Sequence, residues 1–407
     1  MEISIFVELE NGIKVYYQEN KNNYSFITNL FIRADDQGFP EGMSHFVEHI
    51  NFKGIGDIRK SKFLQYLEGK GISINAFTSQ DFICYEMKAL SNSSIEAFKI
   101  LIEMIFDPKF DDSDVENEKS IIKEEIKYVN NEIEYLIKTE MMKLLWGPES
   151  QRGRSVIGTE STIDIIDGSS ISRFIKEKFT TSNIFVSIFG NCDFDKIMLS
   201  LSQIKKRIHH NSDYLLSNNM KINSLEKKRI FNKTINPELV YSCLGYRIGD
   251  WKTEERWIYD LINLYLGEGM SSKLFLRTRE ERSFLYEVWS KPNFFEDGVQ
   301  FLIGFITSPE KKNRTFNEIL KTIKNFDKKK DLNLNILKKR LKADIVFSYD
   351  NPQDMVFDIG RNYMLFGKVY ELQTILNKIE LITLEQVFCV MEKLFLKNEP
   401  YYISIGY

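Results

Sequence analysis

An internal duplication constrains this chain more than any other feature of its sequence. Two segments each combine helical apolar spacing, a loop and an apolar run that ends in glycine, at Gly190 and at Gly406, an offset of 216 residues. Near the other end of the repeat, Leu30–Arg33 (LFIR) resembles Leu244–Arg247 (LGYR) at an offset of 214. Because two independent offsets agree within two residues, we predict two tandem copies of one folding unit. Chance similarity between short amphipathic patterns is the alternative.

Each copy is predicted to be an α+β domain with a mainly antiparallel sheet packed with helices. Apolar patterning in the first half predicts strands at 13–18, 24–33, 72–78 and 82–89. It predicts helices at 43–52, 61–68, 94–105 and 113–145. Hairpins mixed with helices favour α+β over a strict βαβ order. The polar, aperiodic segment 209–228 predicts a linker between an N-terminal domain, 1–208, and a homologous C-terminal domain, 229–407.

Composition excludes several classes of function. Lys and Arg number 55 against 58 Asp and Glu, with a net charge of −3, so no basic field attracts nucleic acid or a membrane surface. The N-terminus lacks the pattern of a signal peptide, and no apolar stretch approaches the roughly 20 residues that span a bilayer. The four cysteines are scattered without a CxxC pair. We therefore expect a cytoplasmic protein without nucleic-acid or membrane partners.

Two of the four histidines form the pattern His45-Phe-Val-Glu48-His49. Residues four apart share one face of a helix, so both imidazoles can reach one metal ion. Zinc accepts such a pair and needs a third protein ligand plus an open position for water. Glu48 lies near the same face, where it can take a proton from that water. The alternative is that the histidines pack against or cap the helix and Glu48 is solvated.

The predicted helix at 113–145 offers a third ligand. Glu118 and Glu125 are seven residues apart and share a face over two turns. Spacing alone does not choose among the acidic residues of this helix, which are Glu116, Glu118, Glu124, Glu125, Glu132 and Glu134.

These motifs together resemble the pitrilysin/insulinase-type zinc metallopeptidases, the inverzincins. The resemblance includes Gly42–His49 (GMSHFVEH), Phe52–Gly54 (FKG), Asn75–Ser79 (NAFTS) and Glu118–Glu125 (EKSIIKEE), and extends along most of the chain. At 407 residues the chain is similar to the compact two-domain form of the processing-peptidase subfamily.

The resemblance implies a role for each residue of the site. His45, His49 and Glu125 bind one zinc ion per chain, and Glu48 is the general base. Glu118 orients a ligand from behind. The counterpart of the histidine helix in the second copy, at 257–264, has no histidine, so we expect one metal site.

A second set of motifs lies in the C-terminal half. Gly269–Phe275 (GMSSKLF) and Arg279–Tyr286 (REERSFLY) resemble family segments whose Arg and Tyr reach the substrate backbone and the developing oxyanion. Arg279 and Tyr286 occupy these positions. The chain has Ser283 where the family has Gly, which costs about 1 kcal/mol if the backbone there is left-handed.

The resemblance also predicts how a substrate binds. Asn75, Ala76, Phe77 and Thr78 correspond to an exposed edge strand to which an extended peptide adds. Both motif sets lie on one chain, so a homodimer with two self-sufficient sites is expected.

Three functions remain open at this stage. The first is a zinc endopeptidase that acts on short, unfolded peptides. The others are a non-catalytic scaffold or partner subunit of the same fold, and a zinc hydrolase of another substrate.

Overall fold

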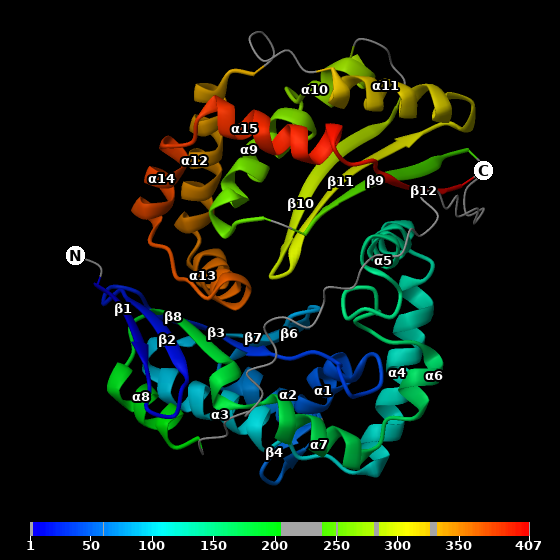
Figure 1. The fold of residues 1–407 in the computed structure, drawn as a ribbon. Helices are drawn as coiled ribbons and strands as arrows, with labels where there is room; N and C mark the ends of the chain where they lie inside the picture. The colour runs from blue at the N-terminus through cyan, green and yellow to red at the C-terminus, as the bar shows by residue number, and fades with distance from the viewer. Residues whose placement is uncertain are drawn as a thin grey trace. The chain divides into compact units, whose positions relative to one another are not determined.

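A computed structural model describes residues 3–59, 61–204, 238–249, 251–280, 285–325 and 332–406. The predicted linker at 209–228 and Ser283 lie outside the described residues. The elements divide into two units (Figure 1). The first unit comprises Met1–Tyr128, Arg154–Met220 and Tyr349–Val369, and the second comprises Val129–Gly153, Lys221–Ser348 and Tyr370–Tyr407.

A six-stranded sheet forms the centre of the first unit, in the order β1-β2-β8-β3-β7-β6. Its neighbouring strands are antiparallel except for the parallel pair β2 and β8. The strands are β1 (Ile3–Glu8), β2 (Lys14–Glu19), β3 (Ser25–Arg33), β6 (Ser73–Thr78), β7 (Phe82–Leu90) and β8 (Ile184–Gly190). A small hairpin pairs β4 (Gly54–Ile55) with β5 (Ile58–Arg59). The helices are α1 (Met43–Asn51), α2 (Ser61–Gly69), α3 (Ser94–Phe106), α4 (Asp112–Val129), α6 (Glu160–Asp164), α7 (Gly168–Lys178), α8 (Phe194–Ser202) and α13 (Pro352–Phe366).

The second unit has an antiparallel four-stranded sheet in the order β10-β11-β9-β12. Its strands are β9 (Val240–Ile248), β10 (Glu287–Phe295), β11 (Gly298–Thr307) and β12 (Tyr401–Ile405). Its helices are α5 (Ile133–Trp146), α9 (Arg256–Leu266), α10 (Lys273–Phe275), α11 (Lys312–Lys324), most of α12 (Leu334–Asp350), α14 (Leu372–Glu380) and α15 (Leu384–Met391).

Strand registers reproduce the duplication that the sequence predicts. Leu30 of β3 pairs with Val186 of β8, and Leu244 of β9 pairs with Tyr402 of β12. Leu244 lies 214 residues after Leu30, and Tyr402 lies 216 residues after Val186, so the two pairs are equivalent in the two copies. The four strands β6-β7-β3-β8 thus recur as β10-β11-β9-β12, and β1 and β2 extend the first sheet. The predicted α+β fold with two homologous domains is confirmed.

Packing does not follow the order of the chain. Helix α13, from the C-terminal half, packs on β3 and β8 of the first unit. Helix α5, from the N-terminal half, packs on β9 and β12 of the second unit. The predicted domains, 1–208 and 229–407, follow the order of the chain. In the structure, each of these two helices instead buries its apolar face on the sheet of the other half. Met355, Val356 and Ile359 of α13 join the core of the first unit in this way.

The helix predicted at 113–145 is wrong as a single element. Helix α4 ends at Val129 and α5 begins at Ile133. Asn130 and Asn131 occupy the break, and asparagine favours turns because its amide competes with the backbone for hydrogen bonds. The break separates α4, nearly all of which belongs to the first unit, from α5, which packs on β9 and β12 of the second.

Across the described ranges, no helix is both long and apolar enough to cross a bilayer. The four cysteines, Cys84, Cys192, Cys243 and Cys389, are free thiols.

Candidate metal centre

The metal centre is built on α1, whose first turn is held by Asp36. The Asp36 carboxylate accepts the backbone N–H of Gly42 at 2.7 Å and that of Ser44 at 2.8 Å. These bonds satisfy N–H groups that have no partner within the helix. Gly42 has a φ of 90°, and a Cβ there would lie 2.8 Å from the Cα of Gly158. Burial raises the pKa of Asp36, although the hydrogen bonds from Ser44 and Gly42 oppose the shift.

Helices α1 and α4 bring two imidazoles and one carboxylate together. Nε2 of His45 lies 3.7 Å from Oε1 of Glu125, and Nε2 of His49 lies 3.7 Å from its Oε2. One ligand atom from each of the three residues lies within 4.8 Å of the others. The Glu125 side chain keeps 37% of its surface exposed, so the group opens to solvent on one side.

The donor set fits a zinc ion. Two bonds of roughly 2.0–2.1 Å at a tetrahedral angle separate their donor atoms by about 3.4 Å, close to the observed spacing. Burial lowers the pKa of His45 to about 3, helped by His49, so His45 is neutral near pH 7 as a ligand must be. Two nitrogens and one oxygen leave a fourth position for water or substrate, as in catalytic zinc sites.

Glu118 holds His49 from behind. Its Oε1 lies 2.7 Å from Nδ1 of His49, which leaves Nε2 to face Glu125. Lys53 forms an ion pair with the other oxygen of Glu118, whose side chain is almost fully buried. Burial raises the pKa of Glu118, but the hydrogen bonds from His49 and Lys53 outweigh it and hold the pKa below its usual value. Burial conversely lowers the pKa of His49, and Glu118 reverses that shift.

Glu48 lies on the same helix between the two histidines and is only 8% exposed. The hydroxyl of Thr78 donates a hydrogen bond to its Oε2 at 2.5 Å. Burial raises the pKa of Glu48, and the Thr78 hydrogen bond partly opposes that shift. A carboxyl group with a raised pKa is better matched to moving a proton near neutral pH than an ordinary one.

The four residues Asn75, Ala76, Phe77 and Thr78 lie in β6, at one edge of the first sheet. Among the described strands β6 pairs with β7 alone, so no described strand pairs with the backbone groups on its other side. Phe77 packs against the apolar core that includes α13. Because strand side chains alternate, Ala76 and Thr78 face the opposite way, towards α1, which contacts β6.

Arg279 and Tyr286 belong to the second unit. Arg279 is exposed in the helical turn Leu276–Glu280, with its guanidinium 5.1 Å from the ring centre of Phe275. Tyr286 is 64% exposed, and its backbone N–H donates to the carbonyl of Ile306 at the start of the β10–β11 hairpin. Both side chains are thus accessible at the surface of that unit.

Comparison with known families decides the class of this protein. Residues 34–160 match the family described as insulinase (peptidase family M16), and residues 166–341 match the one described as peptidase M16 inactive domain. The chain belongs to peptidase family M16. The predicted resemblance is therefore confirmed.

Curated relatives of this M16 chain cover nearly its full length. An uncharacterized zinc protease of Bacillus subtilis (strain 168), YmxG, is 28% identical over 408 residues, which cover 97% of this chain and 96% of that protein. An uncharacterized zinc protease of Rickettsia felis is 25% identical over 396 residues, with 95% and 94% covered. The names of these relatives thus support a zinc protease, which is a hydrolase.

Solved structures share the fold. A protease from Helicobacter pylori aligns with a TM-score of 0.86 at 17% identity and covers 100% of both chains. A peptidase M16 inactive domain from Pseudomonas fluorescens aligns with a TM-score of 0.87 at 18% identity, covering 99% of this chain and 98% of that one.

The second copy of the M16 duplication does not repeat the metal site, because different residues occupy the equivalent positions. Helix α9 contacts β10 as α1 contacts β6. At the offset of 214, His45, Glu48 and His49 become Tyr259, Ile262 and Asn263. Ile262 is fully buried, and Asn263 accepts a hydrogen bond from Ser290 at 2.6 Å. Within the described residues the one group with metal-ligand geometry is His45, His49 and Glu125.

Two contacts of this centre were not assigned from the sequence. Lys53 supports Glu118, and the Thr78 hydroxyl supports Glu48. Lys53 lies in the F-K-G motif and Thr78 in the N-A-F-T-S motif, so both were visible as motif positions. Nothing in the spacing showed which carboxylate each one reaches.

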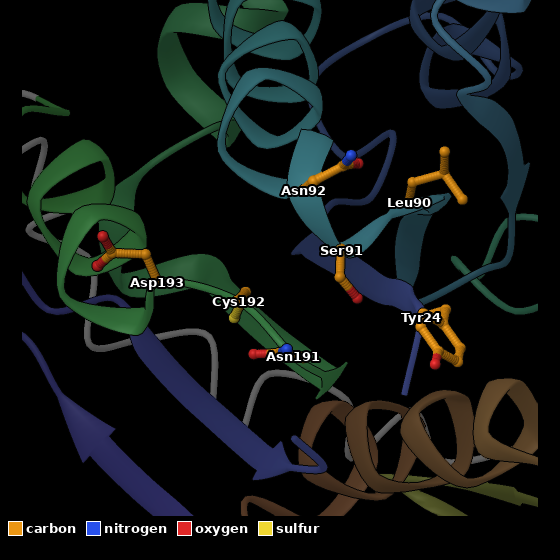
Figure 2. Close-up of a pocket in the computed structure, with 7 residues that line it drawn as sticks. All are labelled: Tyr24, Leu90, Ser91, Asn92, Asn191, Cys192 and Asp193. Atoms are coloured by element: carbon orange, nitrogen blue, oxygen red, sulfur yellow. The ribbon is translucent and has the colours of Figure 1, made fainter. Parts of the chain in front are cut away.

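A separate hollow lies at the other end of the first sheet (Figure 2). It has a volume of about 480 Å³ and is lined by Tyr24, Leu90, Ser91, Asn92, Asn191, Cys192 and Asp193. Thr78 and Phe82 lie at the opposite end of β6 and β7 from Leu90, so this hollow is remote from the metal centre. Ser91 and Asp193 already bind within the protein, to the Asn23 carbonyl and to Lys196.

Proposed function

We propose that this M16 protein is a zinc-dependent endopeptidase that hydrolyses short, unfolded peptides. One observation carries the proposal, which is that the ligand atoms of His45, His49 and Glu125 converge beside the buried carboxyl group of Glu48. This is the arrangement that a hydrolytic zinc site requires, with three protein ligands, an open position and a proton acceptor.

The roles of the chain's own groups follow from their contacts. His45 and His49 hold the metal through Nε2, and Glu125 holds it through its carboxylate. When bound there, zinc polarises a substrate carbonyl and lowers the pKa of a water molecule towards 7. Glu48 accepts the proton of the attacking water and later delivers it to the leaving nitrogen. Glu118 keeps the His49 ring in the orientation that directs Nε2 at the metal.

The substrate binds through its main chain in this proposal. The open edge of β6 is next to Glu48, since Thr78 of that strand contacts it. A peptide that adds to β6 as a further strand needs no particular side chains, which suits short unfolded substrates. We assign Arg279 and Tyr286 to contacts with the substrate backbone and the developing oxyanion, supported by the motif resemblance and by their exposure.

The assembly we propose is a homodimer in the cytoplasm. Its support is that the metal motif and the Arg279–Tyr286 motif both lie on this one chain, so no specialised partner subunit is needed.

A metal assay combined with a peptide assay tests the function. The purified full chain is analysed for zinc and then given a quenched fluorescent peptide library with and without a chelator. We expect one zinc per chain and cleavage that the chelator abolishes. Glu48→Gln should keep its zinc and lose turnover. Glu124→Gln, on an exposed neighbour of Glu125, should behave like the wild type.

Each other outcome has a distinct meaning. Zinc binding without cleavage of any peptide contradicts the endopeptidase and favours the scaffold. Cleavage that survives the chelator removes the metal from the reaction. Full activity in Glu48→Gln removes Glu48 from the mechanism.

A further inference from the structure

The hydrogen bond between Thr78 and Glu48 joins two parts of the site that the chain separates by 30 residues. Thr78 is the last residue of β6, and Glu48 lies in the middle of α1. Among the described residues, Thr78 is the one side chain that hydrogen-bonds to the Glu48 carboxyl group. The orientation of that carboxyl group therefore depends on a single hydroxyl and on packing.

The surroundings of Glu48 make this hydroxyl important. Glu48 is 8% exposed on a helix whose neighbours Phe46, Val47 and Ile50 are fully buried. A buried carboxyl group without a hydrogen-bond partner pays a desolvation cost and turns towards any polar group in reach. The Thr78 bond engages Oε2, and no side chain of the described residues hydrogen-bonds to Oε1.

Thr78 also belongs to the strand whose open edge would receive the peptide. Side chains alternate along β6, so the Thr78 hydroxyl points to α1 while its backbone stays in the plane of the sheet. The peptide and the proton acceptor are thus positioned by the same residue, one through the main chain and one through the side chain.

We propose that Thr78 is a positioning residue for Glu48, in addition to being part of the substrate-binding strand. The inference rests on the proposed endopeptidase function and deepens it. Thr78 does not itself transfer a proton. It holds the carboxyl group of Glu48 in line with a carbonyl whose place is set by pairing with β6, and misplacement of such a group by about 1 Å costs on the order of 100-fold in rate.

Two substitutions separate the hydroxyl from the methyl group of Thr78. Thr78→Val keeps the shape and removes the donor, whereas Thr78→Ser keeps the donor and removes the methyl group. We expect Thr78→Val to lower kcat by about 10–100-fold, with KM and zinc content unchanged, and Thr78→Ser to keep kcat within about threefold. Ser4→Val, an exposed serine in β1 at the opposite edge of the same sheet, is the control and should resemble the wild type.

The result that overturns the proposal is equally specific. Normal kcat in Thr78→Val shows that the hydroxyl has no role. An equal loss in Thr78→Val and Thr78→Ser shows that Thr78 acts by packing, and a rise in KM alone shows that it acts only in substrate binding. Absence of any chelator-sensitive cleavage by the wild-type enzyme is different, because it refutes the proposed function and the positioning role with it.

A measurement without substrate tests the contact itself. In zinc-free protein, Thr78→Val should lower the denaturation midpoint more in the wild-type background than in a Glu48→Ala background, because only the first contains the hydrogen bond. Equal shifts in both backgrounds would show that the two side chains are not coupled in solution and would overturn the proposal.

Discussion

Glu118 lies 2.7 Å from Nδ1 of His49, and the two residues are 69 positions apart in the sequence. The contact determines which nitrogen of His49 carries the proton, since a carboxylate accepts and Nδ1 must donate. Nε2 is then left with its lone pair towards Glu125. Lys53 completes the arrangement, because its ammonium group keeps Glu118 charged in a buried place.

Glu118→Gln should therefore weaken zinc binding without removing a ligand. A neutral amide is a poorer acceptor for Nδ1–H and no longer pairs with Lys53, so we expect zinc affinity to fall by about 10–100-fold. Competition with a chromogenic chelator measures this. Glu124→Gln, exposed on the same helix, is the control. Unchanged affinity in Glu118→Gln would mean that packing alone orients His49.

Glu48 should reduce the stability of the metal-free protein in a pH-dependent way. Burial raises its pKa above the usual value for Glu, of about 4.3, against the opposing Thr78 hydrogen bond. Below that usual pKa, Glu48 is neutral in both states and costs nothing. As the pH rises, Glu48 ionises first in the unfolded chain, so the free energy of unfolding falls. Once Glu48 also ionises in the folded protein, the loss stays constant.

Glu48→Gln should remove this loss. We expect the free energy of unfolding at about pH 7 to rise by about 1 kcal/mol with chelator present, and to change little at about pH 3.5, below the usual pKa of Glu. Chemical denaturation at both pH values measures the difference. A gain of the same size at both pH values would show that packing, rather than a buried charge, causes the difference in stability between Glu and Gln at position 48.

Local patterns were sufficient to predict much of this molecule. The i, i+4 spacing of His45 and His49 depends only on helix geometry, and the strands at 24–33 and 82–89 lie within one residue of β3 and β7. The third ligand was different, since spacing left six acidic residues open and only the resemblance selected Glu125. Which sheet a helix covers is a long-range property, and no local signal assigned α13 to the first unit.

The glycines that end the repeated strands predict a matched pair of effects on stability. Gly190 and Gly406 have φ values of 119° and 118°. A Cβ would lie 2.3 Å from the Ser25 carbonyl oxygen at the first and 2.5 Å from that of Leu239 at the second. We expect Gly190→Ala and Gly406→Ala each to cost about 2–4 kcal/mol in chemical denaturation, from backbone strain and steric overlap.

The control for this pair is Gly249→Ala, where an added Cβ meets nothing within 4 Å. That substitution should change the free energy of unfolding by less than about 1 kcal/mol. A similar cost at all three positions would show that the loss reflects glycine content rather than the two strand ends.

Each sheet packs against a helix from the other half of the chain, and both contacts involve the same position of the repeated strand. In one contact the glycine is on the helix, and in the other it is on the strand. In the first unit, Gly360 of α13 lies against the ring of Phe31 in β3. In the second, Met141 of α5 lies against Gly245 in β9, and Gly245 is equivalent to Phe31 at the offset of 214. Each contact therefore pairs one large side chain with one glycine, so neither helix can come as close to its sheet if both members are large.

Gly360→Ala should destabilise the protein although alanine is the better helix former. An added Cβ would lie 2.0 Å from Cε2 of Phe31, whose ring is fully buried beside Phe82 and Phe357 and cannot move away. Overpacking of this kind costs about 1–3 kcal/mol and exceeds the gain of roughly 1 kcal/mol in helix propensity. Adding Phe31→Leu should make room, so the double variant should lose less than the sum of the single losses in chemical denaturation.

Gly69→Ala, near the end of α2 with nothing within 4 Å, should show only the helix gain. Stabilisation by Gly360→Ala, or strict additivity with Phe31→Leu, would mean that α13 can shift on β3 and that the glycine is not needed for their contact.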